Sequence, residues 1–83
     1  MGVRKHYMTL CIRDNTEITH IEKSGIIEVT FEQDIPGGFK TLVLDMNANV
    51  ITNVGFNLSE IAYFQKFLVQ NRDGILMESR GEI

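Results

Sequence analysis

IIEVTFEQ, residues 26–33, is the stretch that decides the fold. Every second residue is apolar: Ile27, Val29 and Phe31. The residues between them include Glu28 and Glu32, so the stretch has the period of a β-strand with one buried and one wetted face. Such a strand is typical of an antiparallel sheet that packs on the rest of the protein through one side only.

Similar patterns continue on both sides of this strand. They predict four further strands: Tyr7–Arg13, Thr16–Glu22, Phe39–Met46 and Val50–Val54. The segments between them are short and rich in turn residues, such as DIPGG at 34–38, so consecutive strands are expected to pair as hairpins. In the second strand Ile18 and Ile21 fall out of phase, which we interpret as either a bulge or a short strand.

A helix is predicted after the strands, in FNLSEIAYFQKFLVQNRDG, residues 56–74. Asn57 is a good N-cap residue, and Glu60 stands three residues later as in a capping box. Gly74 is suited to a left-handed C-cap, so the helix is expected from Leu58 to about Asp73. A short strand at 75–77 is expected to follow it.

Together these elements predict one α+β domain over residues 1–83. Its sheet would be an antiparallel meander of four to five strands, with one amphipathic helix across one face. Residues 1–6 and 78–83 are expected to be flexible, as chain ends often are.

The apolar residues of the predicted helix do not keep to one side. At about 100° per residue, a broad stripe forms the expected core side: Leu58, Ile61, Ala62, Phe64, Leu68 and Val69. Tyr63 and Phe67 form an aromatic flank outside this stripe. Three covers for the flank are open: the segment after the helix folded back, a second copy of the chain, or a different protein.

Composition narrows the classes of function. The chain has one cysteine, Cys11, so no intrachain disulfide forms and a cytoplasmic location is expected. No apolar run is long enough for a membrane span, and no membrane contact is expected. Net charge is −3, with a basic start up to Arg13 and an acidic segment over residues 14–34.

Motifs that carry chemistry are weak in this sequence. Asp45, Asn47 and Asn49 copy the first ligands of a calcium loop, but the later glycine and glutamate are lacking, so we interpret them as a turn. Cys11 and His20 are conceivable as a nucleophile and base across the first hairpin, without a recognisable third group. We therefore expect no enzymatic activity, no metal site and no cofactor.

The strand meander followed by NVGFNLSE, residues 53–60, and one helix resembles the transcriptional-coactivator-like single-stranded-DNA-binding proteins. The resemblance covers residues 26–70 and implies a dimer that binds DNA along its sheet. The sequence departs from that pattern at Glu28 and Glu32, where such proteins carry Lys or Arg. A nucleic-acid-binding sheet would use the following residues: Arg4, Lys5, Tyr7, Arg13 and Lys40.

The favoured hypothesis is a small non-enzymatic protein-interaction or regulatory module, either with a protein partner or as a homodimer. Its expected protein-binding residues are Tyr63 and Phe67 on the helix flank and Glu28 and Glu32 on the sheet. An acidic sheet face suits a basic protein surface, as in phage-encoded inhibitors that compete with nucleic acid. Single-stranded nucleic-acid binding by the sheet is the alternative.

Overall fold

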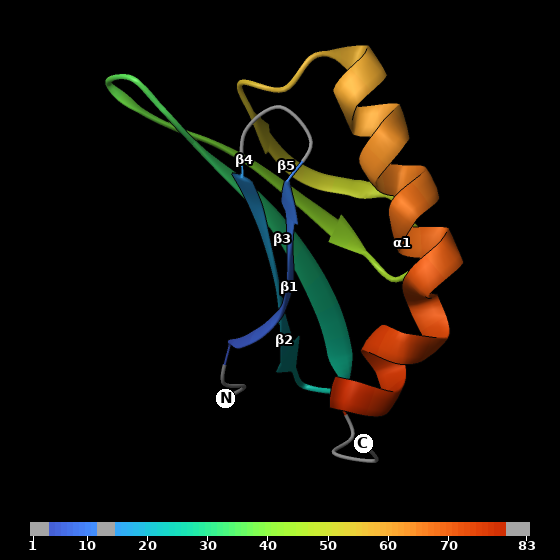
Figure 1. Cartoon of the computed structure of the whole chain (residues 1–83). Helices are drawn as coiled ribbons and strands as arrows, with labels where there is room; N and C mark the ends of the chain where they lie inside the picture. Colours follow the sequence, from blue (N-terminus) through green and yellow to red (C-terminus); the bar gives the residue numbers. More distant parts are fainter. Residues whose placement is uncertain (1–3, 12–14, 80–83) are drawn as a thin grey trace.

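The computed structural model describes residues 4–11 and 15–79 of the chain. Within them, five strands form one antiparallel sheet in chain order, and one long helix packs against one face (Figure 1). The elements are β1 (Lys5–Cys11), β2 (Asn15–Lys23), β3 (Ile26–Ile35), β4 (Gly38–Asp45), β5 (Val50–Val54) and α1 (Leu58–Ser79). The predicted α+β meander is confirmed. Predicted strand residues 12 and 13 lie outside the described residues.

Tight turns hold the meander in register. Ser24 and Gly25 both have positive φ, as a two-residue hairpin turn between β2 and β3 requires. Gly37, at φ 85°, follows Pro36 in the turn that sets Ile35 opposite Gly38. The predicted hairpins, including the one at DIPGG, are therefore present, and β3 is the central strand of the sheet.

The core lies between the sheet and α1, and β3 contributes more buried apolar residues to it than any other strand. Phe31 is fully buried, stacks on Phe64 at 4.7 Å between ring centroids, and meets Phe67 edge-on at 6.1 Å. The buried apolar residues are Ile18, Ile27, Val29, Phe31, Leu42, Leu44, Phe56, Phe64, Leu68 and Ile75. The inward face of IIEVTFEQ is therefore as predicted.

Both explanations offered for the second strand are wrong, because β2 has 9 residues and no bulge where it pairs with β3. β2 pairs with β3 without interruption from Thr16 to Lys23, and the irregularity lies in β1, between His6 and Met8. Ile18 and Ile21 are out of phase because only Ile18 faces the helix. The next inward position is taken by His20, which is buried with its Nε2 3.3 Å from Glu78 Oε1 of α1.

The start of the helix is as predicted and its end is not. The backbone N–H of Glu60 donates to Asn57 Oδ1 (2.9 Å), and the backbone N–H of Asn57 donates to Glu60 Oε1 (3.0 Å). α1 then continues through Gly74 to Ser79, so neither the glycine cap nor the strand at 75–77 forms. Burial of Ile75 on the sheet outweighs the low helix propensity of one glycine.

The longer helix also faces the sheet differently from the prediction. Its buried residues are Phe64, Leu68 and Ile75, whereas Leu58 is 85% exposed and Val69 is also exposed. The packing side is thus rotated toward Phe67, which packs partly buried against the core. Since residues 75–77 are helical, they do not fold back over the aromatic flank, and that expected cover is wrong.

Gly74 fits its position because of a close neighbour. A Cβ there would lie 2.8 Å from the Tyr7 hydroxyl, which donates to Asn71 Oδ1 at 3.4 Å. In a helix interior, alanine is usually better than glycine by about 1 kcal/mol. We expect Gly74→Ala to give no gain in unfolding free energy in the wild type, because the Tyr7 ring must shift.

In a Tyr7→Phe background the hydroxyl is gone, so the same Gly74→Ala change is expected to stabilise the protein by about 0.5–1 kcal/mol. Urea denaturation of the wild type, both single variants and the double variant measures the difference. An equal effect of Gly74→Ala in both backgrounds would show that the Tyr7 contact is not what selects glycine.

Candidate protein-binding surfaces

One face of the sheet is left uncovered by the described residues, since α1 packs on the other. Residues directly opposite on neighbouring strands share a face, so the register gives the composition of this face. Thr19 of β2 pairs with Thr30 of β3, which in turn pairs with Val43 of β4. The open face is therefore mostly polar and β-branched at its centre.

Carboxylates flank this polar centre in like-charged pairs. Glu17 of β2 lies directly opposite Glu32 of β3, and Glu28 of β3 lies opposite Asp45 of β4. Directly opposed Cβ atoms in an antiparallel sheet are only about 5 Å apart, and like charges at that spacing are destabilising. We call Glu17, Glu28, Glu32 and Asp45 the acidic face.

Asp45 remains ionised because the turn after β4 binds its carboxylate. The backbone N–H groups of Asn49 and Asn47 donate to Asp45 Oδ1 at 2.9 Å and 2.8 Å. These bonds, the one from Asn49 foremost, hold the pKa of Asp45 below its ordinary value. The interpretation of Asp45, Asn47 and Asn49 as a turn is confirmed, and the turn leaves a fixed negative charge beside Glu28.

A shallow hollow of about 180 Å³ lies in the acidic face, and one basic side chain, Arg4, lines it. It is lined by Arg4, Glu17, Thr19, Thr30, Glu32, Thr41 and Val43. Arg4 donates to Thr19 Oγ1 at 3.0 Å, and His6 Nδ1 lies 3.2 Å from Glu17 Oε2. Both basic groups come from the β1 side of the sheet, and Arg4 borders the same hollow as residues of β3 and β4.

Phe39 lies on the same face, at the end of the sheet formed by the β3–β4 hairpin. It lies opposite Asp34 in the β3–β4 hairpin and is 57% exposed, which is unusual for a phenylalanine. The sequence-based hypothesis did not single out this residue. The signal was present, because alternation in FKTLVLDM puts Phe39 on the face opposite to Leu42 and Leu44.

The two residues of the other predicted surface, the aromatic flank of the helix, differ in their exposure. Phe67 packs partly buried on Phe31, whereas Tyr63 remains 48% exposed beside Phe64. Tyr63 borders a groove of about 250 Å³ between the start of α1 and the sheet. The two aromatic residues thus do not form one exposed patch, and a binding role for either stays a prediction.

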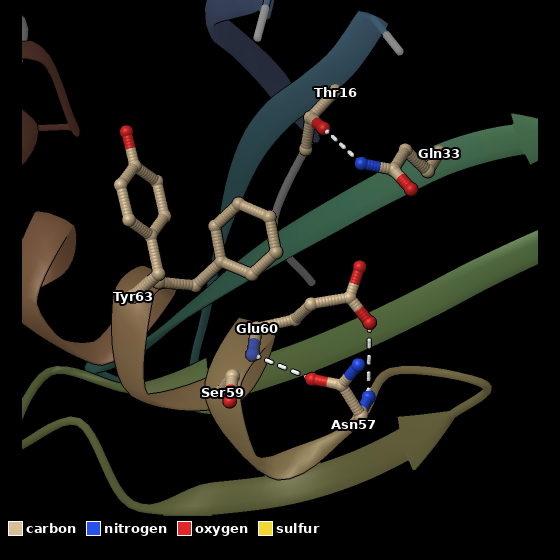
Figure 2. A pocket seen from close by; sticks show the side chains of 7 residues that line it. Thr16, Gln33, Asn57, Ser59, Glu60 and Tyr63 are labelled. Carbon is tan, nitrogen blue, oxygen red and sulfur yellow. Dashed lines mark hydrogen bonds between the residues drawn. The ribbon is translucent and has the colours of Figure 1, made fainter. Parts of the chain in front are cut away.

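Figure 2 shows how this groove is built. Gln33 Nε2 donates to Thr16 Oγ1 at 2.8 Å across β2 and β3, so two buried polar side chains satisfy each other. Asn57 and Glu60 stand across from them in the capping box (Figure 2). The polar groups around the groove are thus largely engaged with one another.

The residues expected for nucleic-acid binding are distributed over two faces. Arg4 lies on the acidic face, whereas Lys40 lies on the helix side, where its Nζ is 3.4 Å from Glu60 Oε2 and 5.4 Å from the Phe56 ring centroid. Tyr7 packs on the helix against Asn71. The described residues therefore form no continuous basic and aromatic stripe, and Arg13 lies outside them.

The conceivable Cys11–His20 pair is separated by the register of the first hairpin. Cys11 lies opposite Asn15, next to the connection, and His20 lies opposite Lys5 at the far end. The side chain of Cys11 lies outside the described side chains. Among residues 4–11 and 15–79, no three His, Cys, Asp or Glu side chains are placed to hold a metal ion.

The described part of the chain has one helix, α1, and its sequence is too polar to cross a lipid bilayer. Comparisons of the chain with models of protein families, with curated proteins and with solved structures each found no match.

Proposed function

We propose that the chain is a non-enzymatic interaction module that binds a basic protein surface through its acidic face. The observation that carries this proposal is the register of the sheet, which sets Glu17 against Glu32 and Glu28 against Asp45. Each opposed pair costs stability in the free protein, and a cationic partner would relieve that repulsion on binding. A lone cysteine favours the cytoplasm as its place of action.

Phe39 supports the same surface. Protein interfaces combine a few large anchor residues with a charged rim, and aromatic residues are enriched among the anchors. The exposed ring of Phe39 lies on the same face as Glu32, two pairs along the β3–β4 hairpin. In this proposal Phe39 supplies apolar contact and the carboxylates supply orientation. Tyr63, on the opposite side of the sheet, remains a proposed contact residue for a second surface.

The test uses a fluorescently labelled polylysine peptide as the basic probe. Glu32→Gln is expected to weaken binding by about two- to fivefold, the scale of an exposed charge pair. The salt dependence of the affinity is not expected to become steeper. The same change is expected to raise the unfolding free energy of the unbound protein by about 0.2–1 kcal/mol, because the repulsion from Glu17 is removed. Anisotropy titration and urea denaturation measure the two effects.

Glu22→Gln is the matched control. Glu22 is exposed at the end of β2 and lies opposite Ile27, on the helix side of the sheet, and its replacement changes the net charge equally. An equal loss of affinity in both variants would show that the effect comes from net charge alone, and it would contradict the proposal. Tight, steeply salt-dependent binding of labelled single-stranded DNA would favour the alternative, nucleic-acid binding.

A further inference from the structure

β5 is an edge strand without the usual protection. Among the described strands it pairs only with β4, so the backbone groups along its outer side have no strand partner. Its sequence, VITNV, has no charge and no proline, and all five residues are exposed. Proteins usually guard such edges with lysine, proline or inward charges. The opposite edge, β1, does carry basic residues, Lys5 and His6.

A different exposed side of α1, which carries Leu58 and Val69, is turned toward the part of the molecule that contains β5. Gln65 Nε2 donates to the backbone carbonyl of Ala48, in the turn between β4 and β5, at 2.9 Å. At about 100° per residue, Leu58 lies about 20° from Gln65 around the helix axis and Val69 lies about 40° from it, so all three residues are on one side of α1. Leu58 and Val69 are both exposed, so this side of α1 presents apolar side chains in the direction of the turn that leads into β5.

We propose that a second copy of this chain adds to β5, so that two β5 strands pair antiparallel about a two-fold axis near Thr52. Such pairing sets Val50 of one copy opposite Val54 of the other and joins two five-stranded sheets into one. Both helices then lie on the same side of the joined sheet, with their Leu58 flanks turned toward the axis. Both acidic faces lie together on the other side.

Charge and symmetry favour a second copy of the chain as the occupant of this edge. A chain of net charge −3 repels its copy in general, but two uncharged β5 strands meet without like charges at the seam. Pairing of β5 with β5 closes after two copies, whereas pairing of β5 with β1 would continue as an open filament. The basic residues of β1 guard against that second pairing.

The test is the native mass of the full chain, measured by light scattering over a range of concentrations. The wild type is expected to show about twice the 9.5 kDa of one chain. Ile51→Lys places a charge in β5 at a position that is 48% exposed, and it is expected to give a folded monomer. Ile26→Lys is the matched control, the same change at the 60% exposed first residue of β3, away from the β5 edge, and it is expected to remain dimeric.

Three outcomes would overturn the proposal: a wild type that is monomeric at every concentration, an Ile51→Lys variant that stays dimeric, or an Ile26→Lys variant that dissociates equally. Hydrogen exchange of the backbone amides gives a second, independent readout on the unmodified chain. Outward amides of β5 are expected to exchange more slowly as the concentration rises. Exchange at one rate across the range would mean that β5 is not the seam.

Discussion

A Phe31→Ala variant is expected to lose about 3–5 kcal/mol of unfolding free energy, the range found when a large buried ring is removed. Phe31 is fully buried on the central strand, and its ring touches both Phe64 and Phe67 of α1. Among the described ring contacts, no other residue of the sheet contacts two aromatic rings of α1. The total unfolding free energy of a small domain is roughly 5–15 kcal/mol, so this variant would lose a large part of the protein's stability.

Phe39→Ala is the control for this variant. The side chain removed is identical, but Phe39 is exposed on the neighbouring strand, so its loss is expected to change the unfolding free energy by less than about 0.5 kcal/mol. Urea denaturation followed by circular dichroism measures both variants. Similar losses in the two would contradict a core centred on Phe31.

An Ile75→Ala variant is expected to lose about 2–4 kcal/mol of unfolding free energy. Ile75 is fully buried although it lies after Gly74, where the sequence pattern places the end of the helix. If the helix packs on the sheet up to Ser79, the deletion leaves a cavity between its last turns and the sheet. The variant therefore tests the part of α1 that the sequence did not predict.

Met77→Ala is the control within the same helix. Met77 is exposed two residues further on, and alanine favours a helix as well as methionine does, so little change is expected. Thermal unfolding of both variants gives the comparison. An Ile75→Ala protein as stable as the Met77→Ala protein would mean that the last turns of α1 do not pack on the sheet.

The strands were predictable because alternation is a local signal. IIEVTFEQ and FKTLVLDM each show their inward faces without reference to any other segment, and the turn residues between strands select hairpins. β2 was harder, since its inward positions include Thr16 and His20. These polar residues are buried because Gln33 and Glu78 supply hydrogen-bond partners from β3 and α1, which no local pattern reveals.

The end of α1 was not predictable for a related reason. Gly74 is a stop signal when only neighbours in sequence are considered, but its lack of a side chain admits Tyr7 from β1. A glycine that caps a helix and a glycine that permits a close approach are indistinguishable in sequence. The same error displaced the expected packing side toward Leu58 and away from Phe67 and Ile75.

Half of the acidic face was predictable. Glu28 and Glu32 share a side of β3 by alternation alone. Their opposition to Asp45 and Glu17 depends on the register of β3 with both neighbours, which the turns set and the composition does not. The exposure of Phe39 follows from the alternation of β4, which puts its ring on the face that α1 does not cover.

The contact between Tyr7 and α1 has a consequence for the order of folding. Tyr7 bonds to Asn71, 64 residues along the chain, and His20 meets Glu78 at a separation of 58. The hairpins of β2 to β5 close over a few residues each and can form early and fast. β1 gains its packing partner only after the last turns of α1 exist. On a ribosome, the first strand to be synthesised would thus be the last to be secured.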